Sequence, residues 1–428
     1  MEGSELRPAT ARLIERASQT FGGAALLLDT ITWGGEVERA FFDADCQRLP
    51  EPTYAVDHDA LSARLANLDA FERELVGDDA LIRLLRLRTH SHRLGARMLL
   101  AVGTKEFSEL SREAYGGARS SSLDHDTTNL DFAEDLARSL GEGSPPDADA
   151  DRIDAKGLTR YLEERLSKRR RAPIVTIAID EELGAKAIAG KRRVRIRSDA
   201  TFDAEEARSL YLHEIETHVF TAQNGDEQPH LRFMDSGGPC STRTQEGLAV
   251  FSELYAQALT SDRLRRLVTR VRLVALAEDG GSFLDLYRWL LERGGEPRAA
   301  YLDAARIARG GVVSGGAPFT KDAAYLGGLV EVYDFLRLAV SRGRQAVVET
   351  LACGRMSLDE VEALASLREE GVLAGPKFVP TWLRRWDDLL THFAFSKALA
   401  EIDARRAAER FAWLGAEPAR PADPRVAP

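Results

Sequence analysis

Apolar residues repeat with a helical period over the first 140 residues. Leucines recur every three or four positions, as at Leu61, Leu65 and Leu68 and again at Leu81 and Leu84, which places them on one side of a helix. Glycine is sparse between residues 36 and 94, so the pattern predicts long helices. We therefore expect residues 1–140 to form a helical N-terminal region.

A change in composition follows this helical region. Residues 141–152 read GEGSPPDADADR, a small, acidic stretch with prolines that is typical of a linker. The chain has 428 residues, more than one hydrophobic core usually holds, so we predict a second domain over residues 153–415. The proline- and alanine-rich residues 416–428 are predicted to form a flexible tail.

Short segments after the linker favour β-structure. We predict one helix and then three strands, at residues 155–169, 173–179, 185–189 and 193–197. The last strand reads RVRIR, so Val194 and Ile196 share one face and the arginines share the other. We interpret these arginines as charges that keep an edge strand soluble. The alternative is that Arg195 lines a cleft for an extended anionic substrate.

The next predicted helix has clear end signals. Asp203 and Glu206 have the spacing of a capping box. Asn224-Gly225 offers a C-terminal stop. The helix is therefore expected to run to about Gln223.

Inside this helix, residues 213–218 read HEIETH, an HExxxH segment. Zinc peptidases more often use HExxH, which places two histidines one turn apart on one helix face. A spacing of five rotates the second side chain by about 140° past a full turn, so His213 and His218 would diverge on a regular α-helix. A π-helical register restores their alignment, and the zinc hypothesis therefore predicts a local π-helix. Glu214 would then act as general base on the attacking water.

A third ligand is needed, because catalytic zinc usually has three protein ligands and one open position. Glu246 opens an apolar, helix-like stretch and could complete a His₂Glu site from a second helix. Other nearby groups compete with it: Glu216, Asp226, Asp235, Glu253 and His230. The spacing alone also leaves open a surface helix with two unrelated histidines.

Several motifs together resemble a known family. They are HEIETH (His213–His218), TRTQEGLAV (Thr242–Val250) and FTKDAAYLGGL (Phe319–Leu329). Two further matches lie upstream, at Val102–Phe107 and Ala114–Gly117. The motifs are similar to the flavohemoglobin expression-modulating QEGLMP-motif family, which is related to the microtubule-associated tyrosine carboxypeptidases. The resemblance covers roughly residues 10–390. Here Ala249-Val250 replaces the Met-Pro of the namesake motif, which leaves the subgroup open.

The resemblance implies a zincin-like catalytic part within residues 153–415, built from the small sheet and the HExxxH helix. The fold class predicted for the whole chain is α+β and mainly α-helical. The resemblance further implies Zn²⁺ as the cofactor, with His213, His218 and Glu246 as metal ligands and Glu214 as the catalytic base. This set agrees with the assignment reached from spacing.

The third motif and one nearby arginine suggest substrate contacts. Lys321 and Tyr325 are four residues apart and lie on one helix face. Tyr325 could donate a hydrogen bond to the oxyanion, and Lys321 could hold a substrate carboxylate. The alternative is a helix start that Thr320 caps and where Tyr325 packs. Arg243, three residues before Glu246, is another candidate carboxylate anchor.

The composition of the chain indicates which classes of partner to exclude. The formal net charge of −10 argues against general nucleic-acid binding. No apolar run approaches the ~20 residues of a membrane-spanning helix, and the N-terminus lacks the features of a signal peptide. We therefore expect a cytoplasmic protein without a membrane partner. Cys46, Cys240 and Cys353 are far apart, so a metal is expected on histidine and carboxylate.

These observations predict a zinc-dependent metallopeptidase, and specifically a carboxypeptidase that hydrolyses the C-terminal bond of a peptide or protein. Two alternatives stay open: a non-catalytic regulatory or binding protein that keeps the fold, and a metal-dependent hydrolase of a non-peptide amide. Glu214 argues against the first, because a structural metal site has no use for that carboxylate. The animal relatives remove a tyrosine from tubulin, a substrate that is not transferred to this chain.

Overall fold

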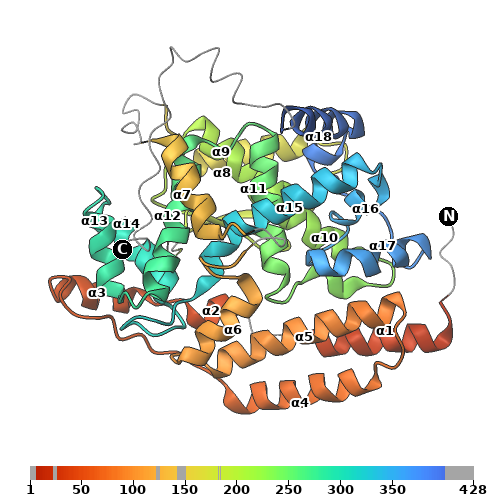
Figure 1. Ribbon diagram of the computed structural model, residues 1–428, viewed down its shortest axis with the longest axis horizontal. Helices are drawn as coiled ribbons and strands as arrows, with labels where there is room; N and C mark the ends of the chain where they lie inside the picture. Colours follow the sequence, from red (N-terminus) through yellow and green to blue (C-terminus); the bar gives the residue numbers. More distant parts are fainter. Residues whose placement is uncertain are drawn as a thin grey trace.

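The computed structural model describes residues 6–22, 27–121, 126–141, 151–181, 183 and 185–400 (Figure 1). Within them the chain is mainly α-helical and has one small sheet, which confirms the predicted fold class. No helix in this part of the chain combines the length and apolar character needed to cross a membrane. Most of the predicted linker and the whole predicted tail lie outside the described residues, so the division into domains stays a prediction.

The region before the linker is helical, as predicted. Its helices are α1 (Pro8–Phe21), α2 (Leu27–Ile31), α3 (Gly35–Asp43), α4 (His58–Glu74), α5 (Ala80–Leu100), α6 (Lys105–Tyr115) and α7 (Asn129–Leu140). These helices share a core with later ones, because Phe71 and Leu84 belong to the same buried cluster as Leu248 and Leu364. The helices before the linker therefore help to hold the later part of the chain in place.

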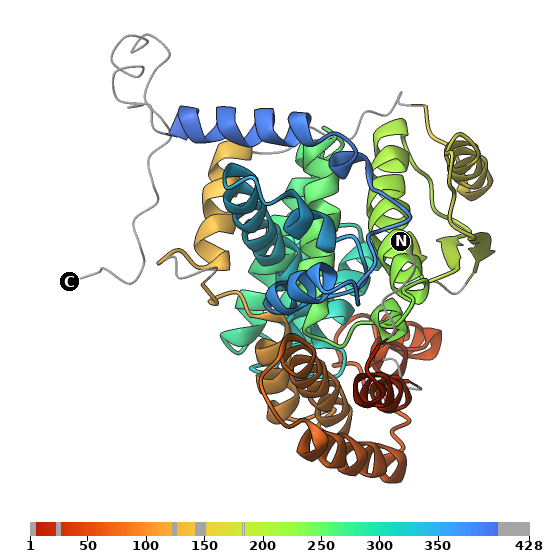
Figure 2. The ribbon, with the colours of Figure 1, turned by 90° about the vertical axis from the view of Figure 1, so that its right-hand side faces the viewer.

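The sheet lies at one edge of the molecule with α8 (Ala155–Ser167), as Figure 2 shows. Its strands are β1 (Thr176–Asp180), β2 (Ala187–Ala189) and β3 (Arg193–Arg197). The strand order is β1-β3-β2, with β3 parallel to β1 and antiparallel to β2. The interpretation of β3 as an edge strand is therefore wrong, because strands pair with it on both sides.

The two faces of β3 have different surroundings. Val194 and Ile196 are buried in a cluster with Leu158 of α8 and Ile215 of the HExxxH helix. Arg195 lies on the opposite face, where its Nη1 is 3.4 Å from the Asp180 carboxylate. A central strand tolerates the arginine because its side chain is 39% exposed and paired with Asp180.

The HExxxH helix consists of three consecutive segments: α9 (Ala204–Leu210), the π-helix η1 (Tyr211–Val219) and α10 (Phe220–Asp226). The Asp203–Glu206 capping box and the π-helix are confirmed. The predicted stop at Asn224-Gly225 is wrong, because both residues lie inside α10. Their role is tertiary: Asn224 bonds the backbone of Ala352, Lys377 and Phe378. A Cβ on Gly225 would lie 2.2 Å from the Met234 carbonyl oxygen.

The remaining elements surround a central helix pair. They are η2 (Arg232–Asp235), α11 (Ser241–Tyr255), α12 (Ser261–Glu278), α13 (Phe283–Leu291), α14 (Pro297–Ala308), η3 (Thr320–Ala323), α15 (Ala324–Ser341), α16 (Gln345–Thr350), η4 (Leu358–Glu360), α17 (Val361–Glu369), η5 (Thr381–Leu383) and α18 (Trp386–Ala400). Figure 1 shows α11 and α15 crossing in the middle of the molecule. They approach closely where a Cβ on Gly247 would lie 2.2 Å from the Gly328 carbonyl oxygen.

Candidate metal centre

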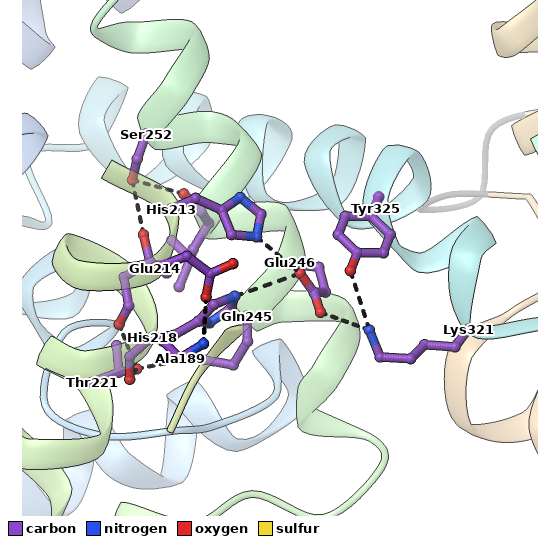
Figure 3. Close-up of polar contacts among 12 residues, drawn as sticks. Ala189, His213, Glu214, His218, Thr221, Gln245, Glu246, Ser252, Lys321 and Tyr325 are labelled. Atoms are coloured by element: carbon purple, nitrogen blue, oxygen red, sulfur yellow. Dashed lines mark hydrogen bonds and ion pairs between the residues drawn. The ribbon is translucent and has the colours of Figure 1, made fainter. Parts of the chain in front are cut away.

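The structure brings the three predicted ligands together (Figure 3). The rings of His213 and His218 have centroids 4.9 Å apart and are nearly perpendicular. Oε2 of Glu246 on α11 lies 3.3 Å from Nε2 of His213 and 3.6 Å from Nε2 of His218. The π-helical register turns both imidazoles toward one point, which is the geometric condition that the spacing of five required.

The donor atoms of this cluster suit a metal ion. Oε2 of Glu246 is buried and has no hydrogen-bond partner among the described residues. A buried carboxylate oxygen without a partner is costly, and a cation between it and the two nitrogens would satisfy it. Two histidines and one glutamate, each offering a single atom within 4.8 Å of the others, form a donor set that zinc accepts. The residues therefore fit the predicted zinc ion.

The competing carboxylates have other partners. Glu216 points to Arg169 and also accepts two hydrogen bonds from Thr381. Asp226 and Asp235 both bond Lys191. None of these three belongs to the cluster of His213, His218 and Glu246. These three carboxylates are near the histidines in the sequence, but their own hydrogen bonds and ion pairs hold them away from the metal cluster.

Glu253 orients the first histidine. Its Oε1 lies 2.7 Å from Nδ1 of His213, while Oε2 accepts a hydrogen bond from Ser209 and pairs with Arg263. Burial raises the pKa of Glu253, but the charge of Arg263 and the hydrogen bond to His213 lower it to about 2. The charged carboxylate favours a proton on Nδ1, which leaves Nε2 facing Glu246. Glu253 follows Glu246 by seven residues, a two-turn spacing that could have identified this role.

The electrostatic potential at His213 is negative. Burial alone would lower the pKa of His213, but the carboxylates of Glu246 and Glu253 raise it to about 10. The same carboxylates would stabilise any cation bound beside the ring. The cluster therefore favours positive charge at the point where the three donor atoms meet.

Lys321 and Tyr325 lie beside the glutamate. Nζ of Lys321 donates to Oε1 of Glu246 at 2.7 Å and lies 3.4 Å from the Tyr325 hydroxyl. Lys321 is only 7% exposed, and although burial lowers its pKa, the charge of Glu246 holds that pKa above the usual value. Tyr325 stacks on His213 with ring centroids 6.3 Å apart. Thr320 makes no capping hydrogen bond and instead bonds Ser111.

Glu214 is held by the edge strand of the sheet. Its Oε2 accepts a hydrogen bond of 2.9 Å from the backbone N–H of Ala189 in β2 (Figure 3). Glu214 is partly buried and lies next to His213, on the same π-helix. One carboxylate oxygen is therefore fixed, and the other is available for a proton.

Two predicted substrate residues are not part of this cluster. Arg243 pairs with Glu331 at 2.8 Å, although it lies on the same helix as Glu246. Arg195 pairs with Asp180 on the open face of the sheet. Among the described residues, neither arginine makes a hydrogen bond or ion pair with His213, His218 or Glu246. Their roles in substrate binding stay predictions without a supporting contact.

Comparison with known proteins adds one finding. A family model described as microtubule-associated tyrosine carboxypeptidase matches residues 39–401, well over half of the chain. The match covers α4 to α18 and includes all the residues of the candidate site. It supports the carboxypeptidase side of the resemblance and does not extend to the flavohemoglobin name. No curated protein matched the chain.

Proposed function

We propose, because the chain belongs to the microtubule-associated tyrosine carboxypeptidase family, that it is a zinc-dependent carboxypeptidase acting on the C-terminus of a peptide or protein. Family membership supports the carboxypeptidase activity. The observation that carries the metal is the buried Oε2 of Glu246, which makes no hydrogen bond with the described residues and faces Nε2 of both His213 and His218. A C-terminal tyrosine is the first substrate to test.

His213, His218 and Glu246 would hold the ion. Bound zinc supplies a Lewis acid that polarises the scissile carbonyl and lowers the pKa of the attacking water. Glu214 takes the proton from that water and transfers it to the leaving amine. The hydrogen bond from Ala189 supports this role, because it fixes the carboxylate while leaving one oxygen open.

Tyr325 and Lys321 have complementary roles in this proposal. The ring of Tyr325 stacks beside His213, and its phenol would donate to the oxygen that becomes negative. Lys321 keeps Glu246 ionised and oriented through its 2.7 Å hydrogen bond. That contact favours a positioning role for Lys321 over the binding of a substrate carboxylate, because its amine already has a buried partner.

Metal analysis tests this function directly. We expect the purified chain to contain about one zinc per molecule, to lose hydrolysis of acetylated peptides on chelation, and to regain it when zinc is added. The same peptides with an amidated C-terminus should be poor substrates. Full activity without metal would contradict the zinc mechanism, and equal cleavage of acid and amide would contradict carboxypeptidase action.

Substitution of Glu253 tests the orientation of His213. Glu253→Gln removes the charge that favours the Nδ1 proton, so zinc affinity should fall by about 10- to 100-fold. Competition with a chromophoric chelator measures this affinity. The control is Glu164→Gln. It removes an exposed carboxylate of α8 that is paired with Lys168, and it should leave zinc binding unchanged. An unchanged affinity in Glu253→Gln would show that this hydrogen bond does not support the metal.

A further inference from the structure

Arg355 is a guanidinium beside the candidate site that has no carboxylate partner in the described part of the chain. It lies in the loop between α16 and η4. Of the atoms that the structure describes, its Nη2 reaches only the His218 carbonyl oxygen, at 3.5 Å, and its buried Nε has no hydrogen-bond partner. Among the described residues, no carboxylate oxygen lies within 4 Å of it. Arg355 is only partly buried, but its buried Nε has no hydrogen-bond partner among those residues. Leaving a buried donor unpaired is costly, so this position is suited to an anion.

The carboxylates that act on Arg355 include two from the candidate site. Burial lowers the pKa of Arg355, and the carboxylates that oppose this most are Asp235, Glu246 and Glu214. Asp235 is already paired with Lys191 at 2.6 Å. Glu246 and Glu214 belong to the candidate site itself. Arg355 therefore adds positive potential next to the reacting groups without neutralising either of them.

The backbone of Arg355 is held from two sides. Its N–H donates to the Met234 carbonyl oxygen at 2.8 Å, and its own carbonyl oxygen accepts a hydrogen bond from Arg88. Arg88 is a buried residue of α5 that also bonds Ser236 and pairs with Glu360 at 2.8 Å. A helix from the N-terminal region thus fixes the loop that carries Arg355. Such a fixed backbone is what a specific binding contact needs.

Four other cations near the site are already engaged. Lys321 is paired with Glu246, and Arg243 with Glu331. Arg263 pairs with Glu253, and Arg270 lies over the Tyr325 ring with its Nε 3.8 Å from Asp322. Arg355 differs from all four because it has no carboxylate partner among the described residues.

We propose that Arg355 binds the α-carboxylate of the substrate's C-terminal residue and that Arg88 positions it. The proposal rests on the proposed function. In that function Glu214 gives its proton to the leaving nitrogen, and the terminal carboxylate carbon is two bonds, roughly 2.5 Å, from that nitrogen. The carboxylate must therefore lie near Glu214. A guanidinium there can form paired, charge-assisted hydrogen bonds with it.

A binding experiment tests the assignment without catalysis. The zinc-loaded Glu214→Gln protein would be titrated with acetylated peptides that end in tyrosine, either as the free acid or as the amide. Adding Arg355→Gln should weaken binding of the acid by about 30-fold and change binding of the amide little. The control is Arg337→Gln, which removes an exposed arginine of α15 paired with Asp334. It should leave both affinities unchanged.

Other results would overturn the assignment. Acid binding that survives Arg355→Gln, or an equal loss for acid and amide, would show that Arg355 does not bind the carboxylate. If Arg355→Gln loses zinc or unfolds, Arg355→Lys decides the question. It keeps the charge but not the paired donors, so it should weaken acid binding more than amide binding. Equal weakening by lysine would also overturn the assignment.

The assay separates this proposal from the proposed function. Suppose that Arg355→Gln loses the preference for the acid peptide but the wild-type protein hydrolyses neither peptide. The carboxylate site would then be supported, and the peptidase activity would be refuted. Suppose instead that the wild-type protein hydrolyses the acid peptide but Arg355→Gln still binds acid better than amide. The assignment of Arg355 would then be refuted, and the peptidase activity would be supported.

Discussion

Glu214→Gln should reduce kcat for removal of a C-terminal residue by about 10³-fold while zinc stays bound. The substitution keeps the size of the side chain and one oxygen that can accept from the Ala189 N–H. It removes the group that takes a proton from water and passes it to the leaving amine. Because Glu214 is not among the three converging donor atoms, the metal content should not change. Single-turnover hydrolysis and metal analysis of the same preparation measure both quantities.

Glu205→Gln is the matched control for this prediction. Glu205 lies in the first turn of α9, is exposed, and is on the same continuous helix as Glu214. Its substitution should leave kcat and zinc content unchanged. Zinc-loaded Glu214→Gln with wild-type kcat would remove Glu214 from the mechanism. Loss of zinc from that variant would instead indicate that Glu214 acts through the metal site.

The sequence predicted the centre of the site because local constraints define it. A spacing of five between His213 and His218 is compatible with one ion only in a π-helix, and that π-helix is present. The Asp203 cap is equally local, since its partner Glu206 is three residues away. Glu246 could be chosen over its competitors with the help of the family motif. The structure brings its carboxylate to both histidines.

Local sequence patterns do not predict contacts between segments that are far apart in the chain. The arginines of β3 predict an edge strand, but strand order depends on pairing between separate segments, and β3 has a partner on each side. Asn224-Gly225 has the composition of a helix stop, but tertiary hydrogen bonds and a close approach to Met234 keep it inside α10. Local propensity is a weak constraint when tertiary contacts compete with it.

The charged side chains illustrate the same limit. The sequence shows that Lys321, Arg243 and Arg195 are cationic, but not that each is paired with a carboxylate of this chain. No motif in the sequence around Arg355 indicates a binding role for it. Its significance comes from the lack of a counter-ion among the described residues beside Glu214 and Glu246. Pairing of charges is a three-dimensional property, so residue type alone does not identify a substrate anchor.

Gly247→Ala should lower the free energy of unfolding by about 3 kcal/mol. Gly247 lies on α11 directly after Glu246, where α11 crosses α15. The added Cβ would lie 2.2 Å from the Gly328 carbonyl oxygen, so one helix backbone must move. That movement separates Glu246 on α11 from Tyr325 on α15 and from the nearby Lys321. We therefore expect weaker zinc binding together with the loss of stability.

Gly35→Ala is the control, since Gly35 begins α3 and a Cβ there would meet only the end of the Arg39 side chain, at 3.5 Å. Its stability should be unchanged or higher by up to ~1 kcal/mol, because alanine favours a helix over glycine. Urea titration of both variants and the parent measures the difference. Equal midpoints for Gly247→Ala and the parent would mean that α11 and α15 do not approach as closely as the structure has them. The close approach of these helices holds the carboxylate of Glu246 beside the phenol of Tyr325. A stable, fully active Gly247→Ala protein would therefore contradict this account of how the site is positioned.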